Sequence, residues 1–314
     1  MREKFSLILE QIKNSQSIVI FNHANCDGDC YGAQIGLKDI ILSTFPDKKV
    51  YALGSGFFNL FKLLGKPDVV SDEIIKNSLI VLVDFNELSR SEDERIYLGN
   101  NYVCLDHHNK GPNFSSYPYF YVNQHRSSAS TIVYEFYKEM NLKISALGVN
   151  ALYAGIVSDT NRFHYLEDDA FSLKCGYELV NMGANFKEIY NVFGKTNRKY
   201  ITLKQYIYTN MKHTDKGVVY CIIKRDYLSS IGFNDYAGSL VNVLSNIEGH
   251  PIWAFFVENE DNKMSVELRS NKVEVLPVAI KYGGGGHPFA SGISKSYFKE
   301  EIINSILNDL DELL

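Results

Sequence analysis

The 314-residue sequence lacks any uninterrupted run of about 20 apolar residues, the length that a membrane-spanning helix needs. Near the start of the sequence, charged residues interrupt the apolar segment before it reaches the length of a secretory signal. An excess of basic residues is also missing, because 32 Lys and Arg stand against 37 Asp and Glu, a net charge of −5. This balance argues against a broad surface for long nucleic acids but allows a short nucleotide in a locally basic site. Because an apolar span and a secretory signal are both missing, we expect a cytoplasmic protein without a membrane segment.

Cysteine is scarce, and the five cysteines are an odd number, which does not suggest a disulfide framework. Cys26 and Cys30 flank two acidic residues with a spacing of four. A pair of thiolates that bind zinc is one interpretation of this spacing. Two small apolar side chains that fill space are the interpretation we favour.

The segment that organises the sequence is 22–32, which follows an apolar run at 18–21 and precedes an amphipathic run at 33–42. It places His23, Asp27 and Asp29 on the turn between a predicted strand and a predicted helix. In open α/β sheets, this turn at the carboxyl end of a strand is where ligands bind. A plain turn needs only one Asp as a helix cap. A histidine together with carboxylates suits Mn²⁺, Fe²⁺ or Zn²⁺ better than Ca²⁺.

Length and the alternation of apolar runs predict two α/β domains. We expect a parallel sheet with helices on both faces in residues 1–185, a helical connector in 186–211, and a smaller α/β domain in 212–314. The predicted strands are 18–21, 50–53, 79–83, 102–105, 218–223, 253–257 and 264–268, the last two as a hairpin. Segments 89–98, 236–247 and 298–313 are predicted to be helices.

Acidic residues and histidines recur where the predicted strands end. Asp84 follows one strand, Asp106, His107 and His108 follow the next, and Asp159 ends an apolar helix. The carboxyl ends of parallel strands share one edge, so these side chains should converge. Carboxylates that are crowded together stay ionised only around cations.

The converging side chains are too many for one ion that must also hold substrate and water. The predicted metal ligands are His23, Asp27, Asp29, Asp84, His107 and Asp159. They suit two divalent ions bridged by Asp84, because its strand should lie between the others. Such a pair predicts hydrolysis of a phosphate ester or anhydride.

Three further segments are candidates for binding phosphate. Residues 127–131 precede a helix, where the serines cap it or its free amides hold a phosphate. Arg162 is a candidate for a phosphate or a carboxylate. Four glycines at 283–286 and then His287 form either a flexible loop or, with Arg269, a pocket for a second phosphate or a nucleotide.

Together these motifs resemble a known family. His-x-x-x-Asp-x-Asp at 23–29, Asp84, the Asp-His-His at 106–108 and Asp159 are similar to the four motifs of the DHH phosphoesterase superfamily. Residues 266–270 and 283–288 resemble the DHHA1 substrate-binding domain. The two-domain length is most similar to the branch that degrades very short oligonucleotides and dephosphorylates 3′-phosphoadenosine 5′-phosphate (pAp).

The resemblance implies a role for each matching residue. His23, Asp27 and Asp84 would hold one Mn²⁺, and Asp29, Asp84, His107 and Asp159 would hold the other. His108 would face the scissile phosphate, and Asp106 would orient a ligand histidine. The implied substrate-binding residues are Arg162, Arg269, Ser270, Gly284, Gly285, Gly286 and His287. The sequence departs from the family pattern at Cys26 and Cys30, where proline or small residues are common, and at Ser291.

Several alternatives stay open at this stage. Hydrolysis of cyclic di-AMP or of the linear dinucleotide pApA is the nearest rival to the cleavage of short single-stranded RNA or DNA. A RecJ-like exonuclease is disfavoured by the acidic charge, and an inorganic pyrophosphatase by the glycine run with His287. A non-catalytic regulator that binds nucleotides is the alternative outside enzymes. The resemblance also suggests a homodimer.

Overall fold

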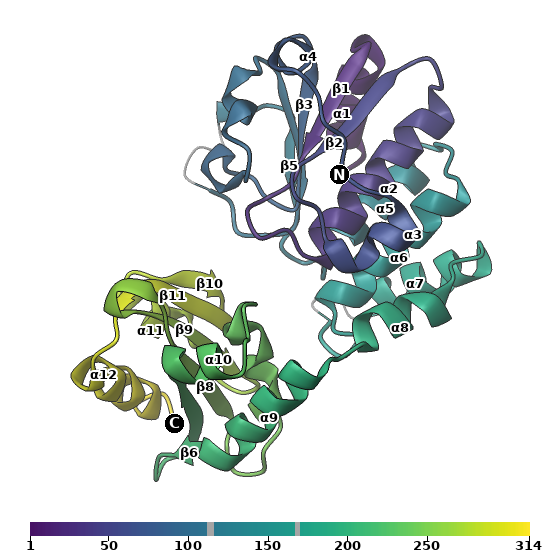
Figure 1. The fold of residues 1–314 in the computed structure, drawn as a ribbon. Helices are drawn as coiled ribbons and strands as arrows, with labels where there is room; N and C mark the ends of the chain where they lie inside the picture. Colours follow the sequence, from purple (N-terminus) through teal and green to yellow (C-terminus); the bar gives the residue numbers. More distant parts are fainter. Residues whose placement is uncertain (112–115, 167–169) are drawn as a thin grey trace. The chain divides into compact units, whose positions relative to one another are not determined.

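The protein consists of two compact units, Met1–Lys195 and Thr196–Leu314, in the computed structural model (Figure 1). The structure describes residues 1–111, 116–166 and 170–314. The segment 186–211, predicted as a helical connector, contains one helix of each unit, α8 (Phe186–Gly194) and α9 (Arg198–Asn210). Among the described residues, none of the helices has both the length and the apolar character that crossing a membrane requires.

The first unit is built on a five-stranded sheet in the order β2-β1-β3-β4-β5, with all neighbouring strands parallel. Its elements are α1 (Arg2–Asn14), β1 (Ser17–Phe21), α2 (Gly28–Thr44), β2 (Lys49–Leu53), η1 (Phe58–Leu60), α3 (Phe61–Leu64), α4 (Asp72–Lys76), β3 (Leu79–Val83), η2 (Leu88–Arg90), η3 (Glu94–Leu98), β4 (Tyr102–Asp106), β5 (Phe120–Val122), α5 (Ala129–Glu139), α6 (Ala146–Asp159), α7 (Phe171–Asn181) and α8. The predicted parallel sheet is confirmed. So is the prediction that the strand before Asp84 lies between the others, because β3 pairs with β1 and with β4.

Alternate residues along β1, β3 and β4 face opposite sides of the first sheet. Ile20 and Val81 pack into the larger apolar cluster, which also contains the buried faces of α2, α5 and α6. Val19 and Leu82 pack into a second cluster on the other face, beneath α4 and η3. The strands are therefore buried on both faces, which explains why they appear as continuous apolar runs in the sequence.

Helices α2 and α6 approach each other closely because glycines line their contact. A Cβ on Gly32 would lie 2.5 Å from the carbonyl oxygen of Ala151 and 2.8 Å from the backbone of Gly155. Both helices are buried along most of their length. The glycine contact therefore determines how near the start of α2 lies to the end of α6, and each of these ends carries predicted metal ligands.

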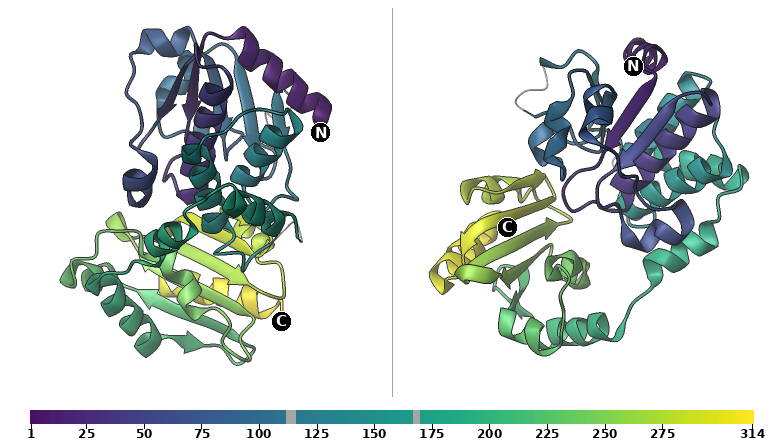
Figure 2. Two further views of the ribbon diagram at one scale, coloured as in Figure 1. Left: turned by 90° about the vertical axis from the view of Figure 1, so that its right-hand side faces the viewer. Right: turned by 45° about the horizontal axis from the view of Figure 1, so that its top comes forward.

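The second unit contains a six-stranded sheet in the order β10-β11-β9-β8-β7-β6, in which only β7 and β8 are parallel neighbours. Its elements are α9, β6 (Lys212–His213), β7 (Val218–Ile223), α10 (Arg225–Ser230), η5 (Ala237–Leu244), β8 (Ile252–Glu258), η6 (Glu260–Asn262), β9 (Lys263–Ser270), α11 (Leu276–Lys281), β10 (Gly285–His287), β11 (Ala290–Tyr297) and α12 (Glu300–Asp311). Helix α12 packs on one face, and α9 and η5 pack on the other (Figures 1 and 2). The predicted hairpin is confirmed as β8 and β9.

One predicted helix is wrong, and another is present as a 3₁₀ helix. Segment 89–98 contains only the short 3₁₀ turns η2 and η3, because Ser91 pairs with His23 and Arg90 accepts a hydrogen bond from the amide of Ala24. These contacts hold the segment against the loop after β1. Segment 236–247 contains a 3₁₀ helix, η5, in which a glycine and β-branched residues lower the α-helical propensity.

The glycine run is part of the sheet and is not a flexible loop. Gly285–His287 form β10, which pairs antiparallel with Ala290–Gly292 of β11. A Cβ on Gly284 would lie 2.1 Å from the carbonyl oxygen of Gly292, and Gly286 has a φ of +137°. Any other residue would be strained at positions 284 and 286. The fold itself therefore accounts for glycine at these two positions, and no bound ligand is needed to explain them.

We predict that Gly32→Ala lowers the free energy of unfolding by about 1–3 kcal/mol, because the added methyl group meets the backbone of α6. Urea denaturation followed by circular dichroism measures this change. The matched control is Gly194→Ala in α8, where a Cβ would meet no atom within 4 Å and alanine favours the helix. Equal unfolding free energies for the two variants would contradict the role assigned to the glycine contact.

Candidate metal centre

The predicted ligands meet at one edge of the first sheet. Asp84 directly follows β3, His107 directly follows β4, and His23 lies two residues after β1. Asp159 is the last residue of α6. Among the described residues, three overlapping groups each bring ligand atoms within 4.8 Å of one another: His23 with Cys30 and Asp84; Asp84 with His107 and His108; and Asp29 with His107 and Asp159.

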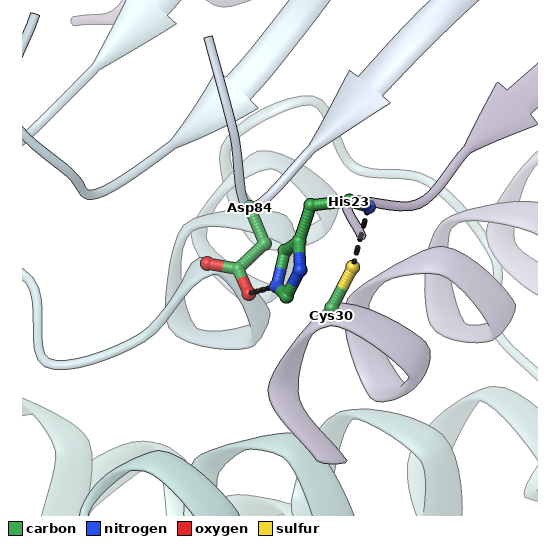
Figure 3. A group of neighbouring side chains, drawn as sticks. All are labelled: His23, Cys30 and Asp84. Carbon is green, nitrogen blue, oxygen red and sulfur yellow. Dashed lines mark hydrogen bonds and ion pairs between the residues drawn. The ribbon is translucent and has the colours of Figure 1, made fainter. Parts of the chain in front are cut away.

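Asp84 is the centre of this arrangement. Its Oδ2 lies 3.2 Å from Nε2 of His23 (Figure 3), and its Oδ1 lies 3.2 Å from Nε2 of His107 and 3.4 Å from Nδ1 of His108. The residue is 2% exposed, and Oδ1 accepts no well-directed hydrogen bond despite these neighbours. A buried oxygen in this position suits a cation, so the residues present fit a metal centre.

The backbone at Asp84 is itself strained. Its φ is +68°, in the left-handed region that residues other than glycine, asparagine and aspartate rarely adopt. Such a conformation costs about 1–3 kcal/mol and occurs mostly at functional sites. It turns the carboxylate at the strand end toward the neighbouring histidines.

Backbone carbonyls set the orientation of both ligand histidines. Nδ1 of His23 lies 2.8 Å from the carbonyl oxygen of Ala24, and Nδ1 of His107 lies 3.0 Å from that of Arg126. A carbonyl oxygen only accepts hydrogen bonds, so each Nδ1 carries a proton. Each Nε2 therefore faces the carboxylates, as in histidines that bind metals.

Asp29 is held by the start of helix α5. Its carboxylate accepts hydrogen bonds from the amides of Ala129 at 2.6 Å and Ser130 at 3.0 Å. The hydroxyl of Ser128 caps the same helix by accepting from Thr131. Of the two interpretations of segment 127–131, the capping one is confirmed, and a carboxylate of the chain occupies the amides considered for phosphate.

Asp27 acts as the N-cap of α2. Its Oδ1 accepts hydrogen bonds from the amides of Asp29 and Cys30, each at 2.9 Å. Asp27 belongs to none of the three ligand groups found among the described residues. Its role as a metal ligand therefore stays a prediction that depends on its other oxygen. Cys26 and Cys30 are buried in the larger apolar cluster, which confirms the interpretation as space-filling side chains, and Cys30 also lies near His23 and Asp84.

The electrostatics of the cluster favour a bound cation. Burial and the nearby charge of Asp84 raise the pKa of Asp29 to about 7. Burial opposes the charged form of His23, but the hydrogen bond to Asp84 and the charges of Asp84 and Asp27 together outweigh it and raise the pKa to about 10. For Asp84, burial opposes the charged form, but the neighbouring imidazoles of His107 and His23 together outweigh it and hold its pKa well below the usual range. Protons therefore supply the positive charge that a metal ion would otherwise provide.

The sequence analysis missed Asn86, which belongs to a buried polar chain behind the cluster. Oδ1 of Asp106 accepts hydrogen bonds from the amide of His107 at 2.8 Å and from Nδ1 of His108 at 2.8 Å. Its Oδ2 accepts a short hydrogen bond from Nδ2 of Asn86, which also donates to the carbonyl oxygen of Asn109 at 3.0 Å. Asn86 thus fixes Asp106, which in turn orients His108. The only sequence signal is a polar residue two positions after Asp84.

The predicted substrate residues of the second unit lie on β9 and β10. The guanidinium of Arg269 forms an ion pair with Glu267 at 3.0 Å and donates to the carbonyl oxygen of Ser291 at 3.2 Å. The hydroxyl of Ser270 accepts from the amides of the two residues at 272 and 273, so it stabilises the turn after β9. His287 pairs with Ala290, next to Arg269.

Arg162 lies three residues beyond the end of α6 in the first unit. It has a φ of +62° and donates a hydrogen bond to the carbonyl oxygen of Phe193 at 2.9 Å. This contact joins the end of α6 to α8. Binding of substrate by Arg162 stays a prediction.

We predict that the affinity for Mn²⁺ rises with pH, because the ion must displace the proton of His23 and, below about pH 7, that of Asp29. Each displaced proton makes binding about tenfold tighter per pH unit. Calorimetric titration of the metal-free protein at about pH 6 and about pH 8, in buffers with different ionisation enthalpies, measures both the affinity and the protons released. An affinity that does not depend on pH would contradict the prediction.

The comparisons with known proteins agree with this geometry. Residues 17–156 match the model described as the DHH family, N-terminal domain, and residues 215–314 match the DHHA1 domain. The chain is 33% identical over 311 residues to the bifunctional oligoribonuclease and PAP phosphatase NrnA of Bacillus subtilis, covering 98% of this chain and 97% of the relative. It is also 33% identical over 302 residues to the protein of the same name from Mycoplasma pneumoniae, covering 94% and 92%.

Among solved structures, an exopolyphosphatase-related protein from Bacteroides fragilis is similar in fold, with a TM-score of 0.89 at 22% identity and coverage of 100% of this chain and 98% of that one. The sequence motifs, the parallel sheet and the two family matches agree along nearly the whole chain. The chain therefore belongs to the DHH/DHHA1 phosphoesterase family, of the oligoribonuclease and PAP phosphatase type.

Proposed function

We propose that the protein is a metal-dependent phosphoesterase that hydrolyses short oligoribonucleotides to mononucleotides and removes the 3′-phosphate of pAp to give AMP. The observation that carries this proposal is the identity of about one third, over nearly the full length, to proteins named for both activities. The ligand set at the sheet edge supports it, because Asp84 lies within 3.2 Å of two histidines. The two domains would comprise residues 1–185 and 212–314, with 186–211 connecting them.

We propose that the site holds two divalent ions, of which Mn²⁺ suits the mixture of imidazole and carboxylate ligands. His23, Asp27 and Asp84 would hold one ion. Asp29, Asp84, His107 and Asp159 would hold the other. Bound ions of this kind polarise the phosphoryl group and activate water as the nucleophile.

The residues around the metal centre would orient the reacting groups. His108 donates its Nδ1 proton to Asp106, which fixes the orientation of the imidazole that would face the phosphoryl group of the substrate. Helix α5 holds Asp29 by two amides, and backbone carbonyls hold His23 and His107. This rigidity fixes the ligands before substrate binds, which is how a preorganised site lowers the barrier.

The second unit would bind a phosphate of the substrate through Arg269 and His287, together with Ser270 and the glycines at 284–286. The backbone of β10 allows close approach at Gly285, where even a Cβ would meet no atom within 4 Å. Arg162 in the first unit would contact another anionic group. A cytoplasmic location and a homodimer stay predictions, and sedimentation of the purified protein would test the latter.

The decisive test offers a 5′-labelled dinucleotide, a pentanucleotide and a long RNA, with pAp and pApA in parallel, each with Mn²⁺. We expect mononucleotides from the two short RNAs, phosphate from pAp and little cleavage of the long RNA. Cleavage of pApA alone would instead indicate the turnover of a second messenger. Binding of these substrates without any hydrolysis would indicate a regulator.

We predict that Asp84→Asn reduces both activities by about two orders of magnitude, because it removes the charge that both ions would share. Asparagine tolerates the left-handed conformation at this position, so the fold should persist. Asp47→Asn, at an exposed position, is the matched control and should keep full activity. Full activity of Asp84→Asn with Mn²⁺ would contradict the metal centre.

We predict that Asn86→Ala lowers kcat about tenfold while KM and the Mn²⁺ concentration for half-maximal activity stay unchanged. The reason is that Asn86 supports Asp106 and His108, which are not proposed ligands. Asn77→Ala removes an exposed asparagine that donates to its own helix and serves as the control. A shift in the Mn²⁺ dependence without a change in kcat would show that Asn86 acts on the metals instead.

A further inference from the structure

The segment that joins β5 to α5 supports two of the ligands proposed for one metal ion. Within it, the carbonyl oxygen of Arg126 accepts a hydrogen bond from Nδ1 of His107 at 3.0 Å. Directly after it, the amides of Ala129 and Ser130 donate to the carboxylate of Asp29 at 2.6 and 3.0 Å. Asp29 and His107 belong to the same ligand group. The position of this short segment therefore affects both ligands at once.

The side chain of Arg126 is fixed by a buried ion pair. Its Nη2 lies 2.6 Å from Oε1 of Glu135, and its Nε donates to Oε2 at 3.3 Å. Glu135 is 5% exposed, so loss of either partner would leave a buried charge without its counter-charge. The guanidinium carbon also lies 3.9 Å from the centre of the Phe171 ring. A planar guanidinium held by two hydrogen bonds and an aromatic ring has little freedom to turn.

The ion pair fastens the segment to helix α5. Glu135 lies in α5, the helix whose first amides hold Asp29. At its other end the segment is joined to the sheet, because the amide of Asn123 donates to the carbonyl oxygen of Asp106 at 3.0 Å. The carbonyl group of Arg126 lies between these two attachments. Its direction therefore depends on the ion pair as well as on the backbone.

The ligands proposed for the other ion have different supports. Nδ1 of His23 donates to the carbonyl oxygen of Ala24, and Asp27 caps the start of α2. Neither of these supports uses the segment before α5. The two metal positions would thus share Asp84 but would differ in the backbone that holds their remaining ligands.

We propose that Arg126 and Glu135 are a positioning pair for one of the two ions, the one whose ligands include Asp29 and His107. Glu135 belongs to none of the ligand groups among the described residues, so the pair acts through the backbone that orients the ligands. Groups behind metal ligands commonly change the affinity for the metal by about 10- to 100-fold. This inference rests on the proposed two-metal centre and adds that an ion pair outside it sets the affinity of one position.

The test is a calorimetric titration of the metal-free full-length protein with Mn²⁺, which measures the affinity for each ion. Glu135→Gln keeps the size of the side chain and one acceptor oxygen, so the fold should persist. We expect the affinity for one ion to fall about tenfold in this variant and that for the other to stay unchanged. The control Glu178→Gln breaks another ion pair of α5, with Lys138 at 3.0 Å, and should leave both affinities unchanged.

The variant Arg126→Gln separates positioning from a simple effect of charge. Loss of a cation near the centre would tighten the binding of Mn²⁺ if charge alone mattered, whereas loss of positioning weakens it. We expect Arg126→Gln and Glu135→Gln to weaken the same ion, each about tenfold. Opposite shifts in the two variants, or equal weakening of both ions, would overturn the positioning role.

Activity gives a second readout. Glu135→Gln should need about tenfold more Mn²⁺ for the half-maximal rate and should regain the wild-type kcat in excess Mn²⁺, because all the ligands remain. A kcat that stays low in excess Mn²⁺ would overturn the proposal. Two bound ions in the wild type with unchanged affinities in both variants would overturn it as well and leave the metal centre intact. A wild type that binds fewer than two ions would contradict the two-metal centre itself, and with it the positioning role.

Discussion

The crowding of carboxylates and imidazoles at one edge of the first sheet is the constraint on which the rest of this unit depends. Asp84 lies at its centre, buried and in a left-handed conformation. Such a group of acids is unstable in an apolar interior unless positive charge accompanies it. In the protein without ions, His23 and His107 supply that charge through their contacts with Asp84. A site that already needs positive charge is prepared for divalent ions.

Rigid backbone elements keep this crowded group in place. The glycine contact between α2 and α6 sets the spacing of the helix ends that carry Asp29 and Asp159. The amides of α5 hold Asp29, and the carbonyl oxygens of Ala24 and Arg126 hold the two histidines. Backbone groups thus orient the ligands, so the geometry does not rely on flexible side chains.

The sequence predicted the sheet and its edge because both depend on local patterns. Apolar runs that end in an acid or a histidine identify strands, and parallel strands bring those ends together. The partner of Asp29 could not be predicted, since the amide of Ala129 lies 100 residues away along the chain. The same holds for Asn86, whose role depends on a hydrogen bond to Asp106. Segment 89–98 was predicted wrongly because contacts with the loop after β1 outweigh its helical pattern.

In the second unit, as in the first, neighbouring groups of the chain hold a charged side chain in place. The side chain is that of Arg269. Glu267 neutralises part of the charge of Arg269, and the carbonyl oxygens of Leu268 and Ser291 accept hydrogen bonds from its Nη1. These contacts leave fewer donors but hold the guanidinium in one orientation, so less entropy is lost when an anion binds. The anion recognition proposed for Arg269 would therefore depend on direction more than on net charge. Such a directed donor suits a chain whose overall charge is negative.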